Sequence, residues 1–224
     1  MPTTFVLVAS PLVGSAAWQW LAAALTGRGT AVAVPELAPV DSEPPVWAAH
    51  VDRIVEQLGR LDDVVLVGHS AAGRLIPLVA DRVPGAACVF LDAQLPVDLL
   101  PPGDDDWFLA HVRSIATDGH LPPWSEWWGT GEWETLVPDP ARRSALKAAL
   151  PRVSLASVEE VPPAPVSPMR AGYIRLSAVY DGEADIAERL GWAVTRLSGG
   201  HLHFVVDEDA VADALVTTAA QLAD

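Results

Sequence analysis

Short apolar runs that alternate with helical patterns constrain the fold of this chain more than any other feature. Each run is rich in aliphatic or β-branched residues and lacks a clear polar face, which is typical of strands covered on both sides. Helical segments separate the runs, so right-handed crossovers are expected to join parallel strands. The predicted strands are 5–8, 31–34, 64–67, 88–91, 173–179 and 193–197, and the predicted helices are 18–25, 46–58, 74–81, 186–191 and 207–222. We therefore predict an α/β fold with a doubly wound, mostly parallel sheet and helices on both faces.

The size and composition of the chain indicate one domain. It has 224 residues, of which 50% are hydrophobic and 19% charged, as in ordinary globular proteins. A chain of this length buries roughly 70% of its unfolded surface, so it needs no disulfide or metal to hold a core. Cys88 is the one cysteine, which excludes an internal disulfide. We expect a single domain over 1–224 that acts as a monomer or homodimer.

The charge balance excludes two classes of partner. The chain has 14 basic and 29 acidic residues and a formal net charge of −15. Nucleic acids and anionic membranes recruit positive patches, so we expect neither as a partner. The N-terminal segment lacks the basic region of a signal peptide, and no apolar run approaches the ~20 residues that span a bilayer. The sequence therefore predicts a cytoplasmic protein.

One segment, residues 95–170, interrupts the alternation of strands and helices. It contains twelve of the 20 prolines and five of the nine tryptophans. Prolines punctuate short helices and loops, so we expect a small lid inserted over the carboxyl edge of the sheet. For any single tryptophan, packing inside the lid is a commoner role than lining a substrate pocket.

A serine stands at the joint between the predicted strand 64–67 and the next helix, in the segment "GHSAAG" (68–73). Ligands of open α/β sheets bind at the carboxyl ends of strands, where Ser70 is expected. Small residues on either side suit a sharp strand-to-helix turn, and the pattern matches the nucleophile elbow Gly-x-Ser-x-Gly except that Ala72 replaces the second glycine. The alternative is a serine that caps the helix.

A serine nucleophile needs a histidine and an acid that orients it. Among the six histidines, His201 follows a late strand and two glycines, so its loop can bring the imidazole over the sheet. Asp181 follows the predicted strand 173–179 and gives the chain order Ser, Asp, His. Asp92, after the strand 88–91, is an alternative acid, although an aspartate there more often closes a turn.

The whole chain resembles the small-lid α/β-hydrolases. The shared features are, in order, "VLVAS" as an early strand, "GHSAAG", an insertion after "CVFLDAQLP", "LSAVYD" and "SGGHLH". The resemblance implies that Ser70 is the nucleophile, His201 the general base and Asp181 the orienting acid of an esterase-like serine hydrolase, with no cofactor and no metal.

The oxyanion hole departs from the family pattern. The first strand of these enzymes usually ends in His-Gly, and the next residue gives an N–H to the oxyanion. Pro11 stands at that position here and has no N–H. The resemblance implies one donor, the N–H of Ala71, and leaves the second to Leu12, to Ser10 or to nothing.

Four of these acidic and histidine residues have alternative roles. His201 and His203 are spaced as a metal pair, but no further ligand cluster follows at short spacing. Glu183 and Asp185 fall at the start of a helix, where acidic side chains interact with its dipole.

The resemblance favours hydrolysis of a small or medium-sized apolar ester, aromatic esters included. One alternative is a lyase or cyclase that uses Ser70 and His201 only as acid and base. In a lyase of this kind, Lys147, the one lysine, could act from a lid helix, or it could be a surface residue. The other alternative is a ligand-binding protein without catalysis. Turnover of generic aryl esters discriminates hydrolysis from both.

Overall fold

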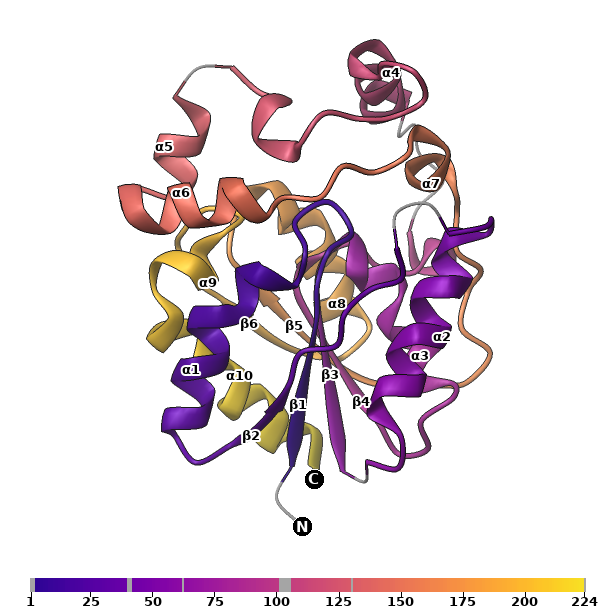
Figure 1. Cartoon of the computed structure of the whole chain (residues 1–224). Helices are drawn as coiled ribbons and strands as arrows, with labels where there is room; N and C mark the ends of the chain where they lie inside the picture. The colour runs from indigo at the N-terminus through magenta and orange to yellow at the C-terminus, as the bar shows by residue number, and fades with distance from the viewer. Residues whose placement is uncertain (1–2, 40–41, 62, 101–105, 130, 224) are drawn as a thin grey trace.

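A parallel sheet forms the centre of the computed structural model, which describes residues 3–39, 42–61, 63–100, 106–129 and 131–223 (Figure 1). The strands lie in the order β2-β1-β3-β4-β5-β6, and every described pair is parallel. They are β1 (Thr4–Val8), β2 (Ala31–Ala33), β3 (Val64–Ser70), β4 (Ala87–Ala93), β5 (Arg170–Arg175) and β6 (Ala193–Arg196). The predicted doubly wound α/β architecture is confirmed.

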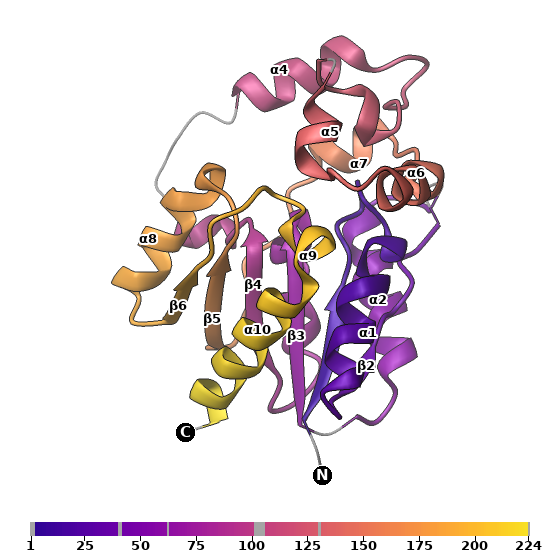
Figure 2. The ribbon, with the colours of Figure 1, turned by 90° about the vertical axis from the view of Figure 1, so that its left-hand side faces the viewer.

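Helices cover both faces of the sheet. The helices on one face are α1 (Gln19–Gly27), α9 (His203–Val206) and α10 (Glu208–Ala223), which lie toward the viewer in Figure 2. The other face carries α2 (Val46–Leu58), α3 (Ile76–Ala80) and α8 (Asp181–Arg189). Strands covered on both faces must be apolar on both, which explains the continuous hydrophobic runs in the sequence.

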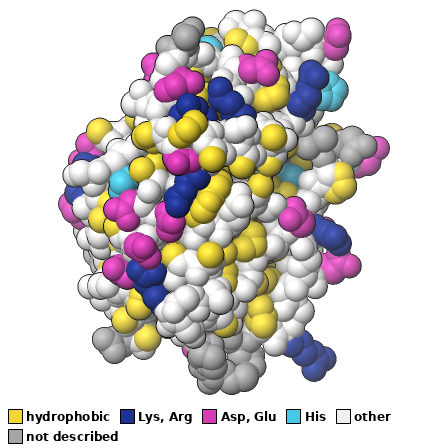
Figure 3. Space-filling view, turned by 60° about the vertical axis from the view of Figure 1, so that its left-hand side comes forward, with side chains coloured by type: hydrophobic (Ala, Val, Ile, Leu, Met, Phe, Trp, Pro, Cys, Tyr) yellow, Lys and Arg dark blue, Asp and Glu magenta, His cyan; other side chains and the backbone are white. Residues whose placement is uncertain are grey.

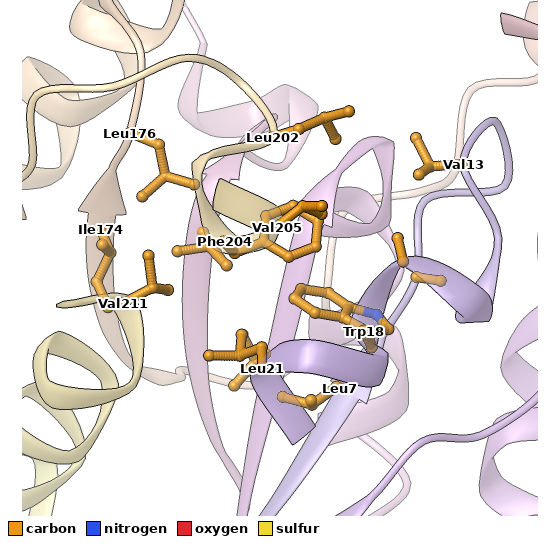
Figure 4. Close-up of a cluster of buried hydrophobic side chains, with 14 of the residues drawn as sticks. Leu7, Val13, Trp18, Leu21, Ile174, Leu176, Leu202, Phe204, Val205 and Val211 are labelled. Carbon is orange, nitrogen blue, oxygen red and sulfur yellow. The ribbon is translucent and has the colours of Figure 1, made fainter. Parts of the chain in front are cut away.

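The alternation of side chains along each strand divides the core into two clusters. Phe5 and Leu7 of β1 point to the face of α1 and α10, whereas Val6 and Val8 point to the face of α2 and α3. Figure 4 shows part of the first cluster, in which Trp18 lies between Leu7 of β1 and Phe204. Both clusters are buried, so core packing fixes the position of the strands and of the carboxyl edge of the sheet.

The chain between β4 and β5 lies over the carboxyl edge of the sheet (Figures 1 and 2). Its described elements are η3 (Val97–Leu99), α4 (Asp106–Ile115), η4 (Trp124–Glu126), α5 (Glu132–Leu136), α6 (Pro140–Ala149) and α7 (Leu155–Glu159). Positions 101–105 and 130 of the predicted lid lie outside the described residues. Trp124, Trp127 and Trp133 are buried in the same cluster as α1, whereas Trp107 is 67% exposed. These three buried tryptophans therefore pack in the hydrophobic core.

The fifth strand begins and ends earlier than the predicted range 173–179. It covers Arg170–Arg175, and the chain then forms η5 (Ala178–Tyr180) and enters α8 at Asp181. The reason lies just past the strand, where the N–H groups of Leu176 and Ser177 donate to the side chain of Asp92 instead of a neighbouring strand. The apolar residues after Arg175 therefore do not extend the strand.

The surface carries many charges of both signs. Figure 3 shows acidic and basic side chains beside one another on one face, with hydrophobic side chains among them. Arg142 pairs with Glu208 at 2.6 Å, which ties α6 to the start of α10. In the described part of the chain, no helix is both long and apolar enough to cross a bilayer.

Gly73 gives a test of the packing under the sharp turn. A Cβ at Gly73 would lie 2.0 Å from the carbonyl oxygen of Gln94, which is backbone and cannot swing away. We expect Gly73→Ala to lower the free energy of unfolding by ~1–3 kcal/mol, the usual cost of overpacking. Gly27→Ala is the control, because nothing lies within 4 Å of its Cβ position. It should leave stability unchanged or raise it by ~0.5–1 kcal/mol in urea denaturation. Equal stability of the two variants would contradict the close approach at Gly73.

Candidate active site

Ser70 lies at a strained turn where β3 meets the short helix η2 (Ala71–Arg74). Its φ is 56° and its ψ is −127°, a left-handed conformation that a non-glycine residue adopts only when its surroundings hold it there. Such strain typically costs 1–3 kcal/mol and concentrates at functional sites. The turn presents the Ser70 side chain at the carboxyl edge of the sheet.

Small residues permit this turn. A Cβ at Gly68 would lie 2.9 Å from the carbonyl oxygen of Ala72, and one at Gly73 would meet the carbonyl oxygen of Gln94. Ala72 itself is buried, and its methyl group fits where the usual pattern has glycine. The strand-turn-helix geometry expected from "GHSAAG" is therefore present.

His201 is oriented by Asp92. The Nδ1–H of His201 donates to Oδ2 of Asp92 at 2.7 Å. Because a carboxylate only accepts, Nδ1 carries the proton and Nε2 of the neutral ring keeps a free lone pair. This is the tautomer that a general base needs.

The carboxylate of Asp92 is fully buried and saturated with donors. Its Oδ1 accepts the N–H groups of Leu176 and Ser177, both at 2.8 Å, and its Oδ2 accepts the Ser177 hydroxyl at 2.7 Å besides His201. The exposed fraction of Asp92 is 0%, and its φ is 45°. A buried charge needs this number of hydrogen bonds to offset its desolvation. The carboxylate is thus held in one orientation.

The structure corrects the expectation that Asp181 orients His201. Asp181 is the first residue of α8, and its Oδ1 accepts from Nε of Arg175 at 2.6 Å. Its side chain is 47% exposed. The error follows from the strand boundary, since β5 ends at Arg175 and the position at the strand end belongs to Leu176 and Ser177. The alternative acid, Asp92, is the one that contacts His201.

His69 and a set of apolar contacts hold the His201 loop in place. Nε2–H of His69 donates to the carbonyl oxygen of His201 at 2.9 Å, and the two rings lie 4.3 Å apart. Phe204 packs against Trp18 with ring centroids 4.6 Å apart, and Figure 4 shows Leu202 on the same loop turned into this cluster. The loop is therefore fixed by a hydrogen bond on one side and by hydrophobic burial on the other.

Tyr180, which sequence reasoning missed, contacts His201 in the structure. Its ring stacks on the His201 ring at 5.1 Å with an interplanar angle of 13°. Burial raises the pKa of Tyr180 well above its usual value, and the Ser70 hydroxyl, which lowers it, offsets only part of that effect. The one sequence signal for Tyr180 was its position next to Asp181, in the segment expected to supply the acid.

The two predicted oxyanion donors, the N–H groups of Ala71 and Leu12, have different surroundings. Ala71 is the first residue of η2, where helical N–H groups have no intrahelical acceptor. The N–H of Leu12 instead donates to Oγ of Ser10 at 3.3 Å, inside the turn that follows β1. The expected role of Leu12 as second donor is therefore not supported by the hydrogen bond that it makes.

The remaining singled-out side chains have other contacts. The His203 ring packs against Gly199, and no group of three or more potential metal ligands occurs among the described residues. Asp185 pairs with Arg196 at 2.8 Å. Nζ of Lys147 lies 5.7 Å from the centre of the Trp133 ring, in cation–π contact.

A cavity of about 230 Å³ opens beside the end of β1. It lies between Pro11 and Gly14 on one side and Pro151 and Val153 of the inserted segment on the other, with Glu36 and His50 also among its lining residues. Trp124 of the same inserted segment reaches His201, with ring centroids 6.0 Å apart. Both contacts place the inserted segment against the edge of the sheet that carries Ser70.

The position of the acid can be tested with two matched variants. Asp92→Asn removes the carboxylate that fixes the His201 tautomer, so kcat/KM of the wild-type reaction should fall by roughly 10⁴. Asp181→Asn loses only partly exposed ion pairs with Arg175 and Arg196, each of which contributes about 0–1 kcal/mol to stability. Steady-state kinetics and thermal melts on both variants decide the assignment. The reverse ranking of the two losses would return the acid to Asp181.

Stability should also depend on the protonation of His69. Burial lowers the pKa of His69 well below its usual value, and the nearby His201 adds to that effect. The unfolded chain protonates this ring below about pH 6.5, whereas the folded chain keeps it neutral. The unfolded state then binds more protons, so the free energy of unfolding should fall as the pH drops from about 7 to about 5. His69→Gln should flatten this dependence, and the exposed His120→Gln should not. An unchanged slope in His69→Gln would refute the assignment.

No family model matches the chain, and no curated protein matches it by sequence. Among solved structures, an extracellular α/β-hydrolase from a Paenibacillus species, described as sharing structural and functional homology with tobacco salicylic acid binding protein 2, is 21% identical. It has a TM-score of 0.72 over 97% of this chain and 99% of that chain.

Two further solved structures show the same similarity. Tomato methylketone synthase I complexed with 2-tridecanone is 15% identical, with a TM-score of 0.72 over 99% of each chain. A pyrethroid hydrolase from Sphingobium faniae is 18% identical, with a TM-score of 0.70 over 98% of each chain. The similarity extends over nearly the full length of each protein. This chain therefore has the α/β-hydrolase fold.

Proposed function

We propose that this protein is a serine hydrolase that cleaves a small or medium-sized apolar carboxylic ester, aromatic esters included, through an acyl-enzyme. The proposal is carried by one observation: a strained Ser70 ends β3 at the carboxyl edge of the sheet, where the adjacent His69 bonds to the His201 backbone and Nδ1 of His201 is bonded to the buried Asp92. A serine, a histidine with a free Nε2 and a fixed carboxylate are the parts that acyl transfer needs.

Acylation uses each of these groups once. Oγ of Ser70 attacks the ester carbon while its proton moves to Nε2 of His201, and the carbonyl electron pair moves onto oxygen. The carboxylate of Asp92 stabilises the imidazolium that forms and does not itself take a proton. The N–H of Ala71 donates to the oxyanion. Collapse of the tetrahedral intermediate expels the alcohol, which takes the proton from His201, and leaves the acyl group on Ser70.

Deacylation repeats the sequence with water. Nε2 of His201 accepts a proton from water as the oxygen attacks the acyl carbon, and the second tetrahedral intermediate collapses. The carboxylic acid leaves and Oγ of Ser70 regains its proton from His201. The strained turn assists both stages, because it keeps Oγ exposed rather than folded into the following helix.

An apolar substrate is supported by the surroundings of His201. The Trp124 and His201 rings form a T-shaped pair, and the centroid of the Trp124 ring lies 5.4 Å from that of Trp133. Aromatic side chains here favour apolar groups and exclude water from the reacting carbonyl. The names of two similar structures agree with this class, since one binds 2-tridecanone and another is a pyrethroid hydrolase. The cytoplasmic location, the monomeric or dimeric state and the absence of a nucleic-acid partner stay predictions.

The nucleophile is tested by turnover and by covalent labelling. Wild-type protein should hydrolyse p-nitrophenyl esters in a series of acyl lengths and react with a fluorophosphonate probe at Ser70 alone. Ser70→Ala and His201→Ala should each lose ~10⁴–10⁶ in turnover, because the members of a triad act as a unit. Ser114→Ala is the control, since that serine is exposed on α4 and its hydroxyl donates only to the His111 carbonyl. Equal labelling of Ser70→Ala and wild type would end the hydrolase proposal.

A further inference from the structure

Ser177 stands just past the end of β5, close to where the sequence predicted an acid. It lies two residues after Arg175, the last residue of the strand, and is 6% exposed. It also directly precedes η5, a position from which a serine side chain commonly caps a helix. The Ser177 side chain makes no such cap and donates instead to Asp92 at 2.7 Å. Helix capping therefore does not account for the hydroxyl at this position.

The Ser177 hydroxyl and the His201 imidazole share one carboxylate oxygen. Oδ2 of Asp92 accepts both the Ser177 hydroxyl and Nδ1–H of His201 at 2.7 Å, while Oδ1 accepts two backbone N–H groups at 2.8 Å. An ionised carboxylate has about four lone-pair sites, so these four donors fill it. Two donors on one oxygen divide its negative charge between them. The bond to His201 is therefore weaker than the bond that Oδ2 would make to the imidazole alone.

We propose that Ser177 is a positioning residue of this site, an inference that rests on the proposed ester hydrolysis: its hydroxyl shares Oδ2 of Asp92 with His201 and limits how strongly the carboxylate holds the imidazole proton. In acylation, Nε2 of His201 takes the proton of Ser70 and then releases it to the leaving alcohol. A carboxylate that pulled harder on the ring would stabilise the imidazolium and delay that release. With Ser177 in place, the carboxylate orients the ring without trapping its charged form. The Ser177 O–H bond does not break in either stage.

The other titratable groups that the structure describes in contact with the His201 ring are His69 and Tyr180. Burial lowers the pKa of His69 well below its usual value and raises the pKa of Tyr180 well above its usual value. Both side chains are therefore neutral near pH 7. Asp92 is the charged partner of the ring, and Ser177 acts on the ring through it.

The proton between His201 and Asp92 gives a direct test, because an Nδ1–H that donates to a carboxylate resonates far downfield in proton NMR spectra. In Ser177→Ala this resonance should move further downfield, since Oδ2 then serves His201 alone. Ser177→Thr keeps a hydroxyl and should stay near wild type. Ser177→Cys has a similar size and only a weak S–H donor, so it should shift in the same direction as alanine and decides the result if the alanine variant does not fold. His201→Ala removes the proton and identifies the signal.

The pH profile of the proposed reaction gives a second readout. A general base acts only in its neutral form, so kcat/KM for p-nitrophenyl butyrate should fall on the acidic side. In Ser177→Ala the pH of half-maximal kcat/KM should rise by ~0.5–1 unit, because the unshared carboxylate stabilises the imidazolium more. Well below that pH the variant should be ~3–10-fold slower than wild type, and well above it the two rates should be similar.

Tyr173→Phe is the matched control, because it removes another buried hydroxyl close to the same carboxylate. The Tyr173 hydroxyl bonds to the backbone N–H and carbonyl oxygen of Ala93, the residue after Asp92. Its loss should lower the melting temperature and leave the downfield resonance and the half-maximal pH at their wild-type values.

The remaining outcomes separate this inference from the proposed function. An unmoved resonance in Ser177→Ala, or one that moves upfield, would overturn the inference alone. A loss of activity that is equal at every pH would overturn it too, because a purely structural role lowers the rate without moving the profile. A wild type that turns over no ester would overturn the proposed hydrolysis, while the resonance would still decide whether Ser177 shares the carboxylate with His201.

Discussion

The candidate site depends on the buried carboxylate of Asp92. Four hydrogen bonds converge on it, from two backbone N–H groups, the Ser177 hydroxyl and His201. A charge with no solvent exposure is tolerable only with such a set of donors, so the donors and the carboxylate must be placed together. The same bonds end β5 at Arg175 and turn the chain toward Tyr180. One electrostatic requirement thus shapes both the acid–base pair and the loop beside it.

The hydrophobic clusters on the two faces of the sheet support the strands that carry this carboxylate. Strands that are apolar on both faces must be buried on both, and the helices of the doubly wound fold provide that burial. Trp18 and Phe204 extend one of the two clusters up to the His201 loop, so hydrophobic packing positions a polar side chain. His69, next to Ser70 in the chain, completes the connection through the His201 carbonyl.

The site differs from the sequence-based expectation in two places. The acid follows β4 rather than β5, and Ser177 occupies the end of β5 as a donor to it. Tyr180, which follows the end of β5, stacks on the ring of His201. Both changes draw on the short loop between β5 and α8. That loop therefore carries more of the proposed chemistry than its length suggests.

The layers of this protein and the place of the turn at Ser70 could be predicted from the sequence alone. Both follow from local rules, since hydrophobic periodicity defines strands and helices and a sharp turn demands small residues at Gly68 and Gly73. The choice between Asp92 and Asp181 was not accessible in the same way. It depends on where β5 stops, and the strand stops because its next N–H groups bond to a carboxylate 84 and 85 residues away in the chain. Such long-range hydrogen bonds leave no local pattern in the sequence, so the acid that meets His201 and the stacking of Tyr180 on that ring are seen only in the folded chain.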